Sequence, residues 1–200
     1  MAKITQAKFV TSAPSIGASP EVEEALEVAF MGRSNVGKSS LLNALTNHKG
    51  LAKSSSTPGK TQLINFFDVI FKEGDENYKA QFVDLPGFGY AKVSKSLKSE
   101  WQRSLTEFIT KRESIKIFVH LIDARHPNLA IDLDVRNHLN SILRENQTIL
   151  EVVTKMDKLN QKERTALKRE LPNALYVSNT KKSGIESLSQ TIFTLLFLSE

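Results

Sequence analysis

The 200-residue chain is 40% hydrophobic with a formal net charge of +5, which suits one folded unit with a substantial core and a modest attraction for polyanions. It contains no cysteine, which excludes disulfide bonds and thiolate zinc sites and fits a reducing cytoplasm. No apolar run approaches the roughly 20 residues of a membrane span, and residues 1–10 lack the apolar stretch of a signal peptide. We therefore expect a cytoplasmic protein with no membrane span.

The N-terminal part of the chain precedes any motif. Residues 12–20 are rich in serine, proline and glycine and are expected to form turns that set Lys8-Phe9-Val10 apart from the main body. We expect residues 1–21 to form an extension packed on the main domain, and residues 22–200 to form that domain.

Residues 32–39 read Gly-Arg-Ser-Asn-Val-Gly-Lys-Ser, a complete G-x-x-x-x-G-K-[ST] phosphate loop between a strand-like run at 26–31 and a helix that opens at 40–45. The glycines let the backbone turn so that its N–H groups face the α- and β-phosphates of a nucleotide. Lys38 is placed to reach the β- and γ-phosphates, and the Ser39 hydroxyl is placed to ligate Mg²⁺. The alternative, a glycine turn with a surface lysine, is disfavoured by the strand before it and the helix after it. The expected phosphate contacts are Gly32, Arg33, Ser34, Asn35, Val36, Gly37, Lys38 and Ser39.

A second phosphate motif follows an expected hairpin. Residues 63–71 and 78–84 are strand-like and are separated by a turn-forming segment at 74–77. Asp84-Leu85-Pro86-Gly87 ends the second strand, which suits an aspartate that holds the Mg²⁺ water shell and a glycine whose N–H meets the γ-phosphate. The D-x-x-G pattern is common by chance, so its value comes from its place after the phosphate loop.

Between these two motifs lies a polar, glycine-containing loop at 47–62. Its segment Ser56-Thr57-Pro58-Gly59-Lys60-Thr61-Gln62 offers a threonine to close over Mg²⁺. Thr57 and Thr61 both qualify from chemistry alone.

Strand and helix patterns alternate through the second half of the chain. Helices are expected at 97–111, 135–143, 163–171 and 185–198, and strands at 115–122, 149–153 and 174–177. The strand at 115–122 is almost wholly apolar, as expected for a central parallel strand buried on both faces. This alternation predicts an α/β fold with a doubly wound sheet.

A base-recognition motif ends the strand at 149–153. In Thr154-Lys155-Met156-Asp157, the aspartate carboxylate can accept two hydrogen bonds from the N1–H and N2–H₂ edge of guanine, a donor pair that adenine lacks. Lys155 can lie along the base and brace the phosphate loop. In Val177-Ser178-Asn179, a backbone N–H is expected to meet the guanine O6. The alternative for residues 154–157 is an ordinary polar strand end.

Taken in order, the segments Gly-Arg-Ser-Asn-Val-Gly-Lys-Ser-Ser, Thr-Pro-Gly-Lys-Thr-Gln, Asp-Leu-Pro-Gly-Phe-Gly-Tyr and Thr-Lys-Met-Asp resemble the EngB (YihA/YsxC) family of bacterial GTPases, in the TrmE–Era–EngA–EngB–septin group. The similarity runs from about Phe9 to the C-terminal helix. It implies a Ras-like P-loop fold with a six-stranded, mostly parallel sheet, and binding of GTP or GDP with Mg²⁺. It also implies a role in assembly of the large (50S) ribosomal subunit and a link to cell division and septation.

The resemblance also implies roles for individual residues. It puts the magnesium threonine at Thr61 rather than Thr57, so the implied metal ligands are Ser39 and Thr61 and the catalytic residues are Lys38 and Thr61. Asn179 departs from the family, which usually has a small residue there. The resemblance puts further nucleotide contacts at residues 59–63. Together with the phosphate loop, the full set of expected contacts comprises Gly59, Lys60, Thr61, Gln62, Leu63, Asp84, Leu85, Pro86, Gly87, Thr154, Lys155, Met156, Asp157, Val177, Ser178 and Asn179.

Two residues bear on the rate of hydrolysis. Phe88 follows the D-x-x-G motif, where Ras-like enzymes keep a glutamine that orients water, and a phenyl ring cannot do this. Slow intrinsic hydrolysis is therefore expected. Asn35 matches a position that related GTPases use to hold K⁺, which would neutralise charge in the transition state. The alternative, that Asn35 only shapes the loop, is equally weighted.

Three functions remain open. The first is a GTP-switched assembly factor, acting as a monomer on ribosomal RNA and proteins, in which the lysines of the segment 92–98 couple nucleotide state to RNA affinity. The second is a division protein that uses GTP as a structural ligand, which Phe88 would allow. The third, an ATP-using enzyme, is disfavoured by residues 154–157.

Overall fold

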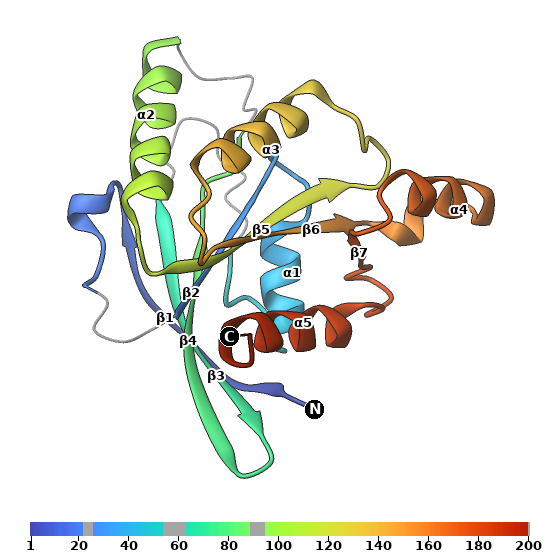
Figure 1. Ribbon diagram of the computed structural model, residues 1–200, viewed down its shortest axis with the longest axis horizontal. Coiled ribbons are helices and arrows are strands. Elements are labelled where there is room, and N and C mark those ends of the chain that lie inside the picture. The colour runs from blue at the N-terminus through green and yellow to red at the C-terminus, as the bar shows by residue number, and fades with distance from the viewer. Residues whose placement is uncertain (22–25, 54–62, 89–94, 200) are drawn as a thin grey trace.

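The computed structural model of the chain describes residues 1–21, 26–53, 63–88 and 95–199, with the backbone alone for residues 95–102. Its described strands form one sheet in the order β1-β3-β4-β2-β5-β6-β7 (Figure 1). Pairing is antiparallel between β1 and β3 and between β3 and β4, and parallel across the rest of the sheet. The strands are β1 (Lys3–Ala13), β2 (Leu26–Gly32), β3 (Ile64–Glu73), β4 (Glu76–Asp84), β5 (Ile115–Asp123), β6 (Thr148–Thr154) and β7 (Leu175–Tyr176).

The sheet has seven strands among the described residues rather than the expected six, because the N-terminal segment pairs along β3. Lys8-Phe9-Val10, which the sequence sets apart from the main body, lies within β1, and the Phe9 ring packs 5.8 Å from that of Phe67. β1 is an edge strand with mostly exposed or half-buried side chains and two register shifts. It therefore lacks the clean alternation by which a strand is recognised.

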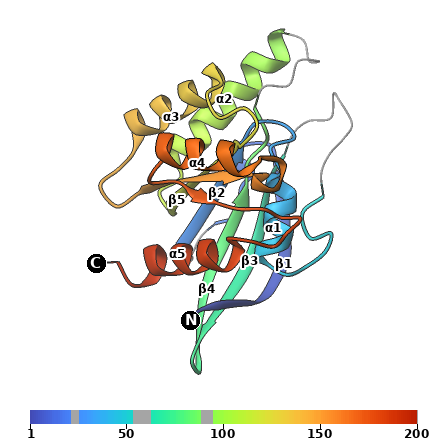
Figure 2. The same cartoon turned by 90° about the vertical axis from the view of Figure 1, so that its right-hand side faces the viewer.

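Helices cover both faces of the sheet, which confirms the doubly wound α/β prediction. Figures 1 and 2 show α1 and α5 on one face and α2 and α3 on the other. None of the described helices combines the length and the apolar character that a bilayer crossing requires. The helices are α1 (Lys38–Leu45), α2 (Lys95–Lys111), α3 (Ala130–Ile142), α4 (Gln161–Glu170) and α5 (Ile185–Phe197), with short 3₁₀ turns η1 (Ile16–Ala18) and η2 (Met156–Lys158).

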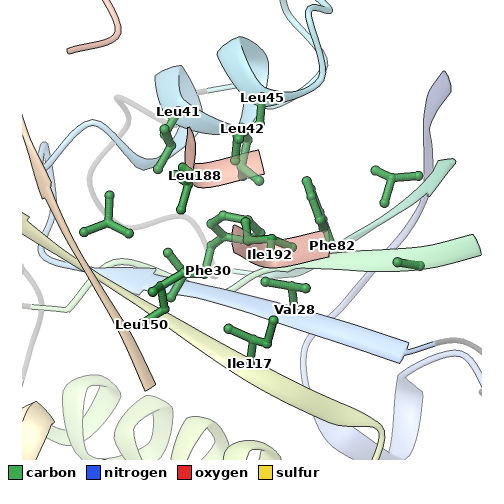
Figure 3. Packing of buried hydrophobic residues seen from close by; sticks show 14 of the residues in the cluster. Val28, Phe30, Leu41, Leu42, Leu45, Phe82, Ile117, Leu150, Leu188 and Ile192 are labelled. Atoms are coloured by element: carbon green, nitrogen blue, oxygen red, sulfur yellow. The ribbon is translucent and has the colours of Figure 1, made fainter. Parts of the chain in front are cut away.

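Two large apolar clusters hold α1 and α5 to one face of the sheet and α2 and α3 to the other, and a smaller third cluster includes Leu167 of α4. On one face, Leu41 and Leu42 of α1 and Ile192 of α5 pack on strand residues such as Val28 and Phe30 (Figure 3). On the other face, Phe108 of α2 and Leu139 of α3 belong to a second buried cluster. The side chains of these clusters are almost fully buried and form the core. Residues available to bind a ligand are therefore found at the ends of the strands.

The carboxyl ends of the parallel strands meet at one edge of the sheet. β2 lies between β4 and β5, and the register sets Phe30 opposite Asp84 and Gly32 opposite Leu121. In the next pair, Asp123 at the end of β5 lies opposite Thr154 at the end of β6. Ligands of open α/β sheets bind at such an edge, at the point where the chain turns from one side of the sheet to the other. That point here is the end of β2.

Candidate functional site

The phosphate loop runs from the end of β2 at Gly32 to the start of α1 at Lys38, as the sequence predicts. Gly37 has φ +104° and Asn35 has φ 64°, so the loop passes twice through left-handed conformations. A Cβ on Gly32 would lie 2.9 Å from Val36 Cγ1 and 3.0 Å from Leu121 Cβ, which only glycine avoids. The loop is compact, and the N–H groups of the first turn of α1 lie at its end, where a helix favours anions.

The D-x-x-G segment lies directly beside this loop. Lys38 donates through its Nζ to the Asp84 carboxylate, which is almost fully buried. The Ser34 N–H donates to the Phe88 carbonyl at 3.0 Å, and the Phe88 N–H donates to the Gly32 carbonyl at 3.2 Å. A Cβ on Gly87 would lie 3.2 Å from the Ser34 nitrogen. Both phosphate motifs are therefore in contact through their backbones.

Residues Thr154 and Lys155 of the segment 154–157 form hydrogen bonds with the same loop. Thr154 is fully buried and its Oγ1 donates to the Val36 carbonyl at 2.7 Å. Lys155 has the left-handed φ of 60°, and its Nζ donates to the Asn35 carbonyl at 2.5 Å. The aliphatic stem of Lys155 passes beside Gly37, since its Cε would be 3.9 Å from a Cβ there. The structure thus brings the third motif to the phosphate loop.

The aspartate of the base-recognition motif is held by the β7–α5 connection. Ser178 donates through Oγ to Asp157 Oδ1 at 2.6 Å, and this hydrogen bond is the main reason that the pKa of Asp157 is lowered from its ordinary value. Only 9% of the Asp157 side chain is exposed. The backbone N–H of Met156 donates to the Val177 carbonyl at 3.3 Å, which joins the two segments. Asp157 is therefore an ionised acceptor with a fixed orientation.

Asn179 contributes a contact that sequence reasoning missed. Its Nδ2 donates to the Gly37 carbonyl at 3.3 Å, whereas its buried Oδ1 has no partner among the described residues. The sequence predicts Asn179 as a nucleotide contact through its segment's backbone and notes that its side chain departs from the family pattern, but it predicts no contact with Gly37. The contact joins positions 142 residues apart, so no local pattern signals it.

Part of the expected site is not described. Thr57 and the segment Gly59, Lys60, Thr61 and Gln62 lie outside the described residues, so the choice of the magnesium threonine stays a prediction. Leu63 directly precedes β3 and is exposed. Ser39 lies in the first turn of α1, and Leu85 and Pro86 are buried beside the loop.

Two charged contacts behind the loop were also missed. Asp123 ends β5 with its carboxylate buried and accepts from Lys155 Nζ at 2.8 Å. Arg33 donates through Nε to Asp132 Oδ2 at 3.2 Å and so ties the phosphate loop to α3. A signal for Asp123 was available: a carboxylate ends a mostly apolar strand at the edge where ligands bind.

The oxygen atoms at this edge suit Mg²⁺, which prefers hard oxygen ligands. In the part of the chain that the structure describes, no group of three or more acidic, histidine or cysteine side chains is placed to hold a metal ion. Among the described residues, a magnesium ion here would depend on the Ser39 hydroxyl as a ligand, on the Asp84 carboxylate to hold its water shell, and on oxygens brought by phosphate groups, as is usual for Mg²⁺ in nucleotide sites.

The fold and the three adjoining motifs define the class of P-loop GTP-binding proteins. A family model described as "50S ribosome-binding GTPase" matches residues 27–155. A probable GTP-binding protein EngB from Aliarcobacter butzleri is 55% identical over 197 residues, which cover 97% of this chain and 98% of the relative. One from Campylobacter lari is 55% identical and covers 94% of each chain. The chain belongs to the EngB family of GTP-binding proteins.

Solved structures agree on the fold. A crystal structure of a probable GTP-binding protein EngB matches with a TM-score of 0.62 and covers 86% of this chain and all of the other, at 22% identity. Aquifex aeolicus Era bound to GDP and AlF₄⁻ matches with a TM-score of 0.60, also at 22% identity, and covers 87% of this chain and 57% of Era. At this identity the likeness speaks for the fold alone, and the family assignment rests on the sequence relatives.

Proposed function

We propose that this chain binds GTP and GDP with Mg²⁺ at the carboxyl edge of the sheet and hydrolyses GTP slowly. The observation that carries the proposal is the convergence of three separate motifs on one loop: Lys38, Asp84 and Lys155 all lie in hydrogen-bond contact with it or with one another. The binding residues are those named from the sequence at 32–39, 59–63, 84–87, 154–157 and 177–179.

Phosphate binding would redistribute the contacts of Lys38. Its Nζ donates to the Asp84 carboxylate, and the β- and γ-phosphates of a nucleotide would compete for that ammonium group. Asp84 would then be free to hold the water shell of Mg²⁺, with Ser39 and Thr61 as direct ligands. When bound, Mg²⁺ supplies positive charge against the phosphate oxygens. The chain supplies the loop N–H groups, Lys38 and the helix N-terminus.

Slow hydrolysis follows from Phe88. Its phenyl ring has no nitrogen or oxygen atom with which to orient an attacking water. Phe88 is also only 7% exposed, and its ring lies 6.3 Å from that of His120. We propose that stimulation comes from K⁺ held at Asn35 or from a group supplied by the ribosome. The exposed position of Asn35 is compatible with an ion at this place.

We further propose that the protein is a nucleotide-dependent assembly factor for the large ribosomal subunit, with a link to cell division. The matched family model is described as "50S ribosome-binding GTPase", which names the large subunit. One solved structure of Era contains nucleotides of 16S ribosomal RNA, which belongs to the small subunit, so it supports RNA binding by this fold and not the choice of subunit. In this chain, Arg164, Lys168 and Lys181 line a pocket of about 450 Å³ beside Asp157, which puts positive charge next to the nucleotide motifs. Use of GTP as a structural ligand in division is the second candidate, favoured by Phe88.

Sedimentation of cell extract through sucrose gradients tests the ribosomal role. With a non-hydrolysable GTP analogue added, the protein should travel with the large subunit, and with GDP it should leave it. Reversal of charge at Lys92, Lys95 and Lys98, whose side chains lie outside the described residues, should reduce that association if they contact RNA. Failure to sediment with ribosomal particles in either nucleotide state would favour the division role.

A further inference from the structure

Lys155 is held on two sides. Its Nζ donates to the Asn35 carbonyl of the phosphate loop and, at 2.8 Å, to Oδ2 of Asp123. Its backbone adopts a left-handed conformation that costs free energy for a residue other than glycine. Because a lysine side chain has several rotatable bonds, it keeps one position only if its ammonium group is held by other residues.

Asp123 is a buried carboxylate held by several hydrogen bonds. Only 4% of its side chain is exposed. Arg125 donates to Oδ1 from its backbone N–H at 3.1 Å and from Nε at 3.0 Å, and to Oδ2 from Nη2 at 2.7 Å. Burial alone would raise the pKa of Asp123, but the hydrogen bonds from Arg125 and Lys155 outweigh it and hold the pKa well below its usual range. The carboxylate is therefore charged, and both of its oxygens are fixed.

The backbone holds this anchor in register with Lys155. Asp123 lies opposite Thr154 in the parallel pairing of β5 with β6, and the Ala124 N–H donates to the Thr154 carbonyl at 3.0 Å. Lys155 is the next residue along the chain. Asp123 and Lys155 are thus placed by two adjacent strand ends, so the ion pair depends on the sheet and not on a loop.

We propose that Asp123 is a positioning residue for guanine-nucleotide binding: it fixes the Lys155 ammonium group against the Asn35 carbonyl, and so holds the lysine stem beside Gly37 where the base and the phosphate loop meet. The inference rests on the proposed nucleotide site and adds to it a residue that acts through Lys155. The alternative is an ion pair that only stabilises the fold.

A double-mutant cycle on nucleotide affinity separates these roles. Asp123→Asn keeps the shape of the side chain but removes its charge, and Lys155→Met keeps the stem but removes the ammonium group. Binding of a fluorescent GDP analogue should weaken about tenfold in Asp123→Asn, a size typical of coupled neighbours. In the Lys155→Met background the same change should weaken binding less than twofold. Equal losses in both backgrounds would overturn the proposal, since Asp123 would then not act through Lys155.

Two comparisons make the result specific. Asp134→Asn removes an exposed carboxylate on α3 and should leave GDP affinity unchanged. If Lys155→Met itself binds GDP as the wild type does, the proposed nucleotide site is wrong. If Lys155→Met weakens binding but Asp123→Asn does not, the positioning role alone fails.

A measurement on the wild-type protein covers the case in which Asp123→Asn does not fold. Buried, hydrogen-bonded lysine ammonium groups exchange their protons slowly enough to be seen by ¹⁵N NMR, and Lys155→Met identifies the resonance. A slowly exchanging Lys155 signal is expected. A signal that exchanges like those of exposed lysines would show that no anchor exists.

Discussion

At the scale of single residues, we propose that Asp157 selects the base. Its carboxylate is held by Ser178 and is kept ionised, so it can accept from both donors on the guanine edge. Asp157→Asn replaces one acceptor oxygen by a donor, which repels guanine and complements the additional carbonyl of xanthine. We expect GDP affinity to fall at least about a hundredfold and affinity for xanthosine diphosphate to rise. Titration with both nucleotides measures this.

The same titration with Asp75→Asn, a change in the exposed turn between β3 and β4, provides the control and should match the wild type. If Asp157→Asn weakened both nucleotides equally, the residue would act on the fold or on the phosphates, and the assignment of the base site would have to be given up.

At the scale of elements, the sequence predicts the strands and helices that carry a strong apolar pattern. The central strand β5 is an example, because it is buried on both faces and its residues are nearly all apolar. β1 was missed as a strand because an exposed edge needs no such pattern. Motifs of consecutive residues, such as the phosphate loop, could likewise be predicted from the sequence. The contacts of Asp123 and Asn179 were not, because they join residues that only the fold brings together.

The link between α3 and the phosphate loop yields an element-scale prediction. The Asp132 side chain is 2% exposed, whereas that of its partner Arg33 is 22% exposed. Removing Arg33 should therefore destabilise the fold more than removing the charge of Asp132. Arg33→Met leaves a buried carboxylate without its cation and should lower the free energy of unfolding by about 3 kcal/mol. Asp132→Asn leaves an arginine that water can reach and should cost about 1 kcal/mol. Urea unfolding without nucleotide gives both values.

Burial first, and the like charge of Asp123 with it, raise the pKa of Asp132 against the opposing charge and hydrogen bond of Arg33. In Arg33→Met the carboxyl group can therefore escape the unfavourable charge by taking a proton, and the loss should shrink at lower pH. The exposed Arg169→Met on α4 is the matched control and should leave stability within 0.5 kcal/mol of wild type, roughly the range of surface changes. Equal costs for Arg33→Met and Asp132→Asn would contradict this account of α3.

At the scale of the whole molecule, His120 makes folding sensitive to acid. It lies in β5 beside Phe88 and is 1% exposed. Neither ring nitrogen has a hydrogen-bond partner among the described residues, although Nε2 lies 3.9 Å from Oδ1 of Asp132. Burial first, and the nearby charge of Arg136 second, lower its pKa from 6.5 to about 4. The folded protein thus holds the neutral ring, whereas the unfolded chain takes up a proton near pH 6.5. The stability that His120 contributes is complete above that pH and is lost as the pH falls towards 4, up to about 3 kcal/mol.

The variant His120→Leu isolates this effect from the groups that surround the ring. Asp132, Arg136, Glu151 and Glu170 line the pocket with His120 and stay in both proteins. The raised pKa of Asp132 acts in the opposite direction, because the folded state then binds its proton first as the pH falls. The difference in unfolding free energy, variant minus wild type, should grow between pH 7 and pH 4 in favour of the variant. Parallel curves over that window would contradict this account. They would mean that the folded protein stabilises the charged ring, through water or through the Asp132 carboxylate 3.9 Å from Nε2, enough to offset its burial.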